Sequence, residues 1–292
     1  MTARFAGLRS RMLPGGAGAA PRGARDVGTV MRTGAFVLAV AWLALVVAWS
    51  AVPGLFTSFD PSVGVTADKF LPPSTAHLFG TDYLGRDLFA RVAYGARGSV
   101  AIALLAVGIG VVVGSAIGLA GGFFEHAVDA ILGRFVDVLL AIPSLLLAVV
   151  IVVSLGFATL HVAIAVGVSS IAVFARLMRS EVMRVKKLPF VESSFLIGGT
   201  GVSTLLHHVL PHTFRSVLAL AVLQFGAAIL VISGLAFLGY GDPPPSSDWG
   251  YLVAEGKNYL PSYLWLVTCP GAVIVLTVLA LNRISLRVRG AS

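Results

Sequence analysis

The chain has 292 residues, of which 57% are hydrophobic and only 12% are charged. Because soluble domains carry about 25% charged residues, this composition excludes an ordinary soluble protein and predicts an all-α integral membrane protein. The formal net charge of +8 could suggest a nucleic-acid partner, but the placement of the charges favours a membrane topology signal and no nucleic-acid binding.

Six stretches are long and apolar enough to form transmembrane helices. About 20 apolar residues in a helix cross a hydrocarbon core of roughly 30 Å. The stretches lie near residues 34–52, 98–120, 130–155, 159–178, 213–238 and 263–282. The short alternating segments of a transmembrane barrel do not occur. We therefore expect six transmembrane helices.

The distribution of lysine and arginine predicts the orientation. With a cytoplasmic N-terminus, sixteen of the 21 Lys and Arg residues fall on the cytoplasmic side. The five on the outer side are Lys69, Arg86, Arg91, Arg97 and Lys257. Cytoplasmic loops carry the excess of positive charge, so the sequence predicts a multi-pass membrane protein with both termini cytoplasmic.

The N-terminal part is interpreted as a basic, disordered cytoplasmic tail, residues 1–33, followed by a first transmembrane helix over residues 34–52. An alternative is a cleaved signal sequence, with Ala48 and Ser50 as the small residues of a cleavage site. The apolar run is longer than the usual 7 to 15 residues and follows a long tail, which favours an uncleaved anchor in the membrane lipid.

An extracytoplasmic segment is expected over residues 53–97, followed by a transmembrane core over residues 98–283. The first helix of the core has glycines at four-residue spacing: Gly110, Gly114, Gly118 and Gly122. Such a face of bare backbone lets another helix approach closely. That helix either belongs to this chain, which we favour, or to a second membrane subunit.

The span near residues 130–155 contains two charged residues and a proline. Asp137 could serve as a proton relay, because ionisable residues in membrane spans are functional candidates. Arg134, one turn away, favours a structural ion pair with Asp137 instead. Pro143 removes a helical hydrogen bond and predicts a kink. Sequence patterns of an intramembrane hydrolase or metal enzyme, such as GxSxG and HExxH, are missing.

A cytoplasmic loop separates the fourth and fifth spans. Val191 and Phe195, and likewise Val202 and Leu206, are four residues apart, which predicts two short amphipathic helices. Gly198, Gly199 and Gly201 would join them. Such a unit could lie on the membrane or enter a groove of a soluble partner. A metal site is not expected at His207, His208 and His212, because no cysteine or carboxylate completes the ligand set; Cys269 is the single cysteine.

The same loop resembles the E-A-A-x3-G-x9-I-x-L-P loop of ABC-importer permeases. The matching residues are Glu192, Ser193, Ser194, Gly198, Leu210 and Pro211. Ser193 and Ser194 replace the two alanines, and His208 stands at the isoleucine position. In that family the loop is a coupling helix that docks into a cytoplasmic ATPase, so the resemblance implies a coupling loop over residues 181–212.

Two further stretches resemble the dipeptide/oligopeptide/nickel permease family, in the pattern of its C-type member. HLFGTDYLGRDLFARVAYGARGSV, residues 77–100, has the family pattern with Ala90 in place of a serine. Its matching residues include Gly80, Thr81, Asp82, Gly85, Arg86, Asp87, Arg91, Gly95 and Arg97. Residues 233–256 are similar to the L-S-F-L-G-x-G…P…W-G segment. The C-terminus departs from the pattern, and residues 284–292 are interpreted as a cytoplasmic tail.

The resemblance implies the type I ABC importer permease fold and ATP-driven import of peptides, with nickel or another small solute as the alternative. It also implies a B-type permease partner, two cytoplasmic ABC ATPase subunits and an extracytoplasmic substrate-binding protein. A Walker GxxxxGK[ST] loop does not occur, so we expect no ATPase activity and no cofactor in this chain, with ATP and Mg bound by the partners. A self-sufficient secondary transporter is the competing class. Asp82, Arg86 and Asp87 either bridge to the binding protein or pack internally.

Overall fold

The computed structural model describes residues 22–124, 127–156, 158–196, 200–241 and 245–290. The fold is nearly all helical, and within these ranges the sole β-bridge joins Thr81 to Asp87. The α-helices are α1 (Arg22–Ala51), α2 (Leu88–Ile109), α3 (Ser115–Phe123), α4 (Ala127–Ala141), α5 (Ser144–Leu155), α6 (Thr159–Val185), α7 (Pro189–Leu196), α8 (Gly201–Thr204), α9 (Leu210–Leu235), α10 (Trp249–Gly256) and α11 (Trp265–Gly290).

Short π-helical turns join several of these helices into longer spans. A π turn over Gly110–Gly114 connects α2 to α3, and one over Leu205–Val209 connects α8 to α9. Five helical spans in the described residues are long and apolar enough to cross a membrane, and α4 with α5 makes a sixth if the bent pair counts as one span. The expected six transmembrane helices are therefore confirmed.

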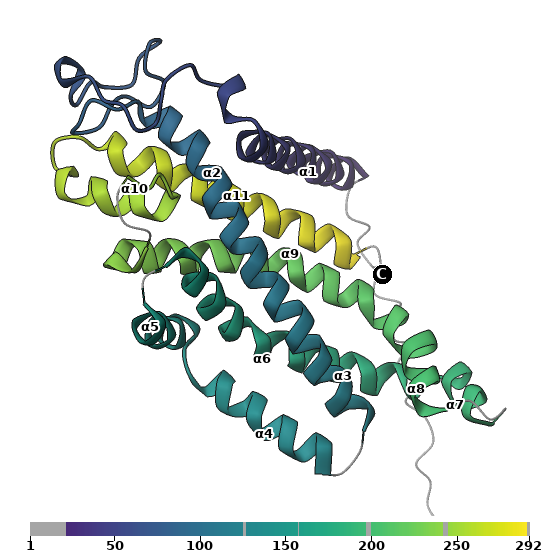
Figure 1. Ribbon diagram of the computed structural model, residues 1–292. Coiled ribbons are helices and arrows are strands. Elements are labelled where there is room, and N and C mark those ends of the chain that lie inside the picture. Colours follow the sequence, from purple (N-terminus) through teal and green to yellow (C-terminus); the bar gives the residue numbers. More distant parts are fainter. Residues whose placement is uncertain (1–21, 125–126, 157, 197–199, 242–244, 291–292) are drawn as a thin grey trace, which may run out of the picture.

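The bundle is built around α6. In the most apolar window of α6, 56% of the residues are buried, whereas only 17% are buried in that of α1. Helices α2, α3, α5 and α9 pack against α6, and α1 lies outside them against α2 and α11 (Figure 1). A hydrogen bond of 3.1 Å from the indole nitrogen of Trp42 to the hydroxyl of Thr277 joins α1 to α11. The loop that follows α1 lies together with helix α10 at one end of the bundle. Helices α7 and α8 lie at the other end.

The face with Gly110, Gly114, Gly118 and Gly122 packs against α6. A Cβ atom at any of these positions would overlap with α6, for example 2.7 Å from the Cβ of Phe174 at Gly114 and 2.7 Å from the Cβ of Met178 at Gly118. Backbones that approach this closely gain extensive van der Waals contact without side-chain ordering. The helix partner of this face therefore belongs to the chain itself.

Pro143 has a larger effect than a kink. Helices α4 and α5 meet at an angle of 92°. Pro143 has extended backbone angles, φ −54° and ψ 129°, and its ring disfavours helical geometry in the residue before it. The helix therefore stops at Ala141 and restarts at Ser144 in a new direction. Gly156, with φ 100°, ends α5.

Several expected boundaries differ from the structure. Helix α1 begins at Arg22 and not at residue 34, so the basic tail is helical from residue 22 onward, and residues 1–21 lie outside the described part. Helix α2 begins at Leu88, so the last part of the expected segment 53–97 is helical. Helices α6 and α11 extend past their apolar stretches to Val185 and Gly290. A helix does not need to end where the hydrocarbon ends, because water satisfies its exposed backbone groups equally well.

Candidate functional site

The sequence pattern around residues 80–97 forms a compact loop that leads into α2. Gly80 and Gly85 have φ values of 75° and 77°, which side chains with a Cβ rarely adopt. At Gly85 an added Cβ would overlap with the backbone of Val65, so the loop is also packed against the preceding chain. Thr81 is fully buried, and its hydroxyl accepts a hydrogen bond of 2.8 Å from the backbone N–H of Leu71.

A buried charge cluster lies at the centre of this loop. The carboxylate of Asp82 accepts hydrogen bonds from Arg86 Nε at 2.7 Å and from Arg91 Nη1 at 2.8 Å. Arg86 Nη2 also donates to Glu255 Oε1 at 3.1 Å, and Arg91 forms a short ion pair with Glu255. Two arginines and two carboxylates therefore balance, and the cluster joins α2 to α10.

The cluster shifts the pKa of Tyr83, which lies beside it, and of Arg86, which is one of its members. Burial raises the pKa of Tyr83, and so does its hydrogen bond of 3.0 Å to Glu255. Burial alone would lower the pKa of Arg86, but the adjacent Asp82 and Glu255 raise it above its ordinary value. Both groups are thus held in the protonated form that the hydrogen bonds require.

Asp87 has a separate role at the start of α2. Its carboxylate accepts a hydrogen bond of 2.6 Å from the backbone N–H of Ala90, which is the geometry of a helix N-cap. The other carboxylate oxygen lies 2.8 Å from Nδ1 of His77. Asp82, Arg86 and Asp87 are all buried, and each is bonded within this chain. This geometry fits the internal packing alternative and not the bridge to a binding protein.

The second half of the pattern lies on α2 and holds α10. At Gly95 an added Cβ would overlap with the backbone of Ser247. The indole N–H of Trp249 donates to the carbonyl oxygen of Val92 at 2.9 Å, and the hydroxyl of Ser99 bonds the carboxylate of Asp248. Arg97, by contrast, is exposed on the other side of the helix. The Trp249-Gly250 stretch and the residues 80–95 therefore form one packed unit.

The expected coupling loop lies at the opposite end of the bundle and is built from α7 and α8. Of the matching residues, Gly198 lies outside the described residues, and Glu192 is placed on α7 without a described side chain. The exposed Ser193 donates its hydroxyl to the carbonyl oxygen of Pro189 at 2.9 Å. Ser194 is buried, and its hydroxyl lies 3.0 Å from that of Thr204 on α8. The serine that replaces a family alanine thus bonds the two helices together.

The second short helix is not a separate element. Helix α8 continues through the π turn Leu205–Val209 into α9, and residues Gly201–Tyr240 form one helical span. Leu210 and Pro211, the first residues of α9, therefore lie inside a continuous helical span. Because Pro211 lacks an N–H group, a π turn just before it accommodates the missing hydrogen bond.

The tip of this loop exposes apolar side chains. Leu196, at the end of α7, is 87% exposed, and Val202 on α8 is 59% exposed. Phe190 and Leu206 are also exposed. The ring of Phe190 lies 4.8 Å from that of His212. Within the described residues, no three His, Cys, Asp or Glu side chains come together as metal ligands, at His207, His208 and His212 or elsewhere.

One expected ion pair is wrong. Arg134 and Asp137 of α4 do not form a salt bridge with each other in the described residues. Instead, Arg179 of α6 binds Asp129 of α4 with two hydrogen bonds, one of which is 2.7 Å from Nη2 to Oδ2. The pair that joins α4 to α6 is therefore a tertiary contact between residues 50 positions apart.

Comparison with known proteins identifies the family of this chain. Residues 106–290 match the family described as binding-protein-dependent transport system inner membrane component. The dipeptide transport system permease protein DppC of Alkalihalophilus pseudofirmus is 35% identical over 237 residues, covering 81% of this chain and 78% of the relative. The di/tripeptide transport system permease protein DppC of Pseudomonas aeruginosa is 36% identical over 253 residues, covering 85% and 82%.

A further relative is the glutathione transport system permease protein GsiD of Escherichia coli, which is 38% identical over 210 residues and covers 72% of this chain and 69% of that protein. Among solved structures, an amino acid ABC transporter crystallised with histidines aligns with a TM-score of 0.54 at 16% identity. The alignment covers 68% of this chain and 94% of the other, and it shows the shared permease fold. This chain therefore belongs to the family of binding-protein-dependent transport system inner membrane components, as a multi-pass membrane permease.

Proposed function

We propose that this chain is the C-type permease subunit of an ATP-driven importer that carries di- or oligopeptides across the bacterial cytoplasmic membrane. The observation that carries the proposal is identity of 35% and 36% to dipeptide and di/tripeptide permeases over more than four-fifths of the chain. In this proposal a B-type permease completes the translocation path and an extracytoplasmic binding protein delivers the peptide. In this proposal both termini lie in the cytoplasm, which the excess of Lys and Arg supports.

The α7–α8 unit is the proposed docking site for the cytoplasmic ATPase subunits, which bind ATP and Mg. Exposed apolar residues at the tip, such as Leu196 and Val202, suit a groove on a soluble partner. Because α8 and α9 form one helical span, a displacement of the docked tip moves a transmembrane helix directly. The hydrogen bond between Ser194 and Thr204 makes α7 follow the same movement. This is a two-state element biased from a distant site.

A co-purification experiment tests the proposal. The tagged chain is isolated in mild detergent, the co-purifying proteins are identified by mass spectrometry, and ATP hydrolysis and dipeptide uptake are measured after reconstitution into liposomes. We expect a second permease and P-loop ATPases in the complex. A chain that moves solute without any ATPase would instead identify a self-sufficient secondary transporter.

A second substrate is favoured by one observation. The relative GsiD is named as a glutathione transport permease, and glutathione is itself a tripeptide-like solute. Competition between glutathione and dialanine for uptake in the same liposomes distinguishes glutathione from dipeptides as the substrate. Nickel, the earlier alternative, is tested by its ability to inhibit uptake of the same probe.

A further inference from the structure

A charged cavity lies between α3, α4 and α6, in the half of the bundle that contains the α7–α8 unit. Its volume is about 390 Å³. Pockets for small molecules in proteins range from about 300 to 1,000 Å³. The charged residues in its lining are Asp129, Arg134, Asp137, Arg176 and Arg179. The remaining lining is made of glycines and small or aliphatic residues.

Among the described residues, three of the charges in this cavity lie outside the salt bridge of its lining, although Asp137 also interacts electrostatically with Arg179. Asp129 and Arg179 neutralise each other through their paired hydrogen bonds. Within the described residues, Arg134, Asp137 and Arg176 take part in no salt bridge, although all three line the cavity. The cavity therefore offers two cationic groups and one carboxylate to a ligand.

The side chains of Arg134, Asp137 and Arg176 are all exposed, so the cavity is open to its surroundings. Arg134 and Asp137 lie in the second and third turns of α4, inside the bent membrane span. Ionisable side chains at this depth face the bundle interior or a water-filled space, because contact with hydrocarbon is costly. Helix α4 has a second, apolar stripe made of Ile131, Phe135 and Val138, which is exposed and does not line the cavity.

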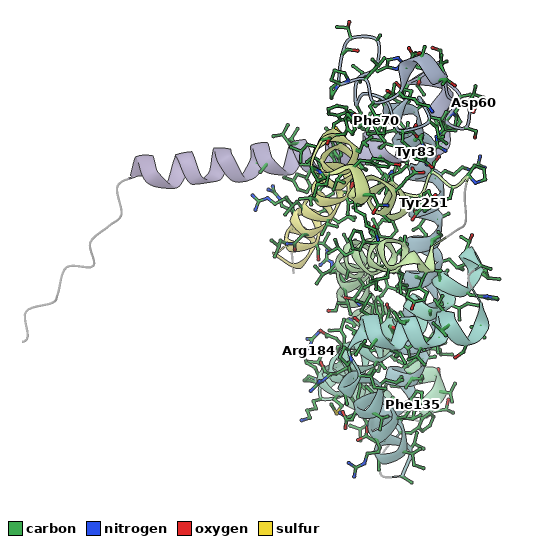
Figure 2. All side chains as sticks on the ribbon, turned by 90° about the vertical axis from the view of Figure 1, so that its left-hand side faces the viewer. Asp60, Phe70, Tyr83, Phe135, Arg184 and Tyr251 are labelled. Atoms are coloured by element: carbon green, nitrogen blue, oxygen red, sulfur yellow. The ribbon has the colours of Figure 1, made fainter. Side chains whose placement is uncertain are left out.

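Figure 2 looks onto this side of the molecule, with the α4 and α5 region toward the viewer and Phe135 labelled. The apolar stripe suits lipid or a second permease, whereas Arg134 and Asp137, which are also exposed, line the cavity. The two faces of α4 thus separate a membrane-facing surface from a polar space inside the span.

The mixture of charges selects the class of ligand. A free peptide carries a carboxylate at one end and an ammonium group at the other, and an extended dipeptide spans about 7 Å. Arg134 and Asp137, one helical turn apart, have Cβ atoms about 5 to 6 Å from each other. Guanidinium groups bind carboxylates with two parallel hydrogen bonds, and a carboxylate binds an ammonium group. A free phosphate or an anionic lipid headgroup would use the arginines but leave Asp137 without a cationic partner, so a ligand that carries both charges matches the cavity better.

We propose that this cavity is a peptide-binding station on the translocation path, where Arg134 and Arg176 hold the peptide carboxylate and Asp137 holds its amino terminus. This inference rests on the proposed function. It assigns to the permease a contact with peptide termini that does not depend on the side chains of the peptide. The station would therefore accept many sequences while excluding solutes of a single charge.

The test uses the complete transporter, purified through a tag on this chain and reconstituted with its binding protein in liposomes containing phosphatidylglycerol. Uptake of radiolabelled dialanine and ATP hydrolysis are measured together for the wild type, Arg134→Gln and Asp137→Asn. Arg134→Lys keeps the positive charge, and Ile131→Val alters the apolar stripe of the same helix. Recovery of the assembled complex by size-exclusion chromatography shows that each variant folds, and both test variants remove a charge from the membrane span.

We expect Arg134→Gln and Asp137→Asn to lower dialanine uptake per ATP hydrolysed by about tenfold, since each loses one charge-assisted contact. Arg134→Lys should retain most of the uptake, and Ile131→Val should match the wild type. Unchanged ratios in both test variants would overturn the proposal.

A lipid site predicts a different result. Wild-type uptake would then fall when phosphatidylglycerol is replaced by phosphatidylcholine, and Arg134→Gln would be insensitive to the exchange; this outcome also overturns the peptide station. If ATPases co-purify but the wild type takes up no dialanine, the peptide substrate of the proposed function fails, which the wild-type measurement alone reveals.

Discussion

Breaking the buried charge cluster between α2 and α10 should destabilise the permease strongly. Arg91 is fully buried and shares Asp82 and Glu255 with Arg86. In Glu255→Met, two arginines remain with one carboxylate, and in Arg91→Met two carboxylates remain with one arginine. Removing one partner of a buried pair costs about 3 to 5 kcal/mol because the other charge stays buried without compensation.

The double variant Arg91→Met with Glu255→Met should cost far less than the sum of the single changes. It leaves Arg86 with Asp82, joined at 2.7 Å, as a balanced pair. Replacement of a whole buried ion pair by apolar residues of similar volume is often neutral. In a double-mutant cycle of these two substitutions, the coupling energy should therefore favour the pair of Arg91 and Glu255 by at least about 2 kcal/mol.

The assay is thermal unfolding of the detergent-purified chain, followed by the loss of its monodisperse size-exclusion peak. With about 2 °C per kcal/mol for a chain of this size, each single variant should lose about 6 to 10 °C in Tm. The double variant should recover more than half of that loss. Additive losses would refute the reasoning, since they would mean that the two side chains contribute independently.

Four further results follow from the contacts. Gly114→Leu should lower stability by about 1 to 3 kcal/mol or prevent assembly because it overlaps with α6, whereas Gly108→Ala, which has open space around it, should be neutral or stabilising in the same thermal assay. Ser194→Ala should cost about 1 kcal/mol by leaving the buried Thr204 hydroxyl without its partner, and Ser194→Ala with Thr204→Val should recover part of it. Leu196→Asp should release the proposed ATPase subunits in a pull-down without changing Tm, whereas Val63→Asp, an exposed change in the loop after α1 at the opposite end of the bundle, should retain them. The raised pKa of Tyr83 contributes stability that is present below about pH 10 and is lost as the pH rises through the folded-state value; the Tm of the wild type should therefore fall more steeply above pH 10 than that of Tyr83→Phe, and parallel curves would contradict this assignment.

Several features of this protein followed from the sequence alone because they depend on local chemistry. The number of spans follows from stretch length, since a helix has a fixed rise per residue and the bilayer a fixed thickness. The glycine face from Gly110 to Gly122 follows from four-residue spacing, which places those positions on one side of a helix. The family patterns identified the permease class, because their residues are read in order along the chain.

Other features were decided only by the tertiary structure. Glu255 was not singled out as a site residue, although it completes the charge cluster with Arg91 across 164 positions. Likewise, Arg134 and Asp137 have the spacing of an ion pair, but Arg179 reaches Asp129 from a neighbouring helix instead. The 92° break at Pro143 and the continuity of α8 with α9 also depend on how each helix packs. A charged residue or a proline limits the conformations and contacts of its own segment. The partner that satisfies it depends on which helices meet, and they meet only when the bundle is assembled.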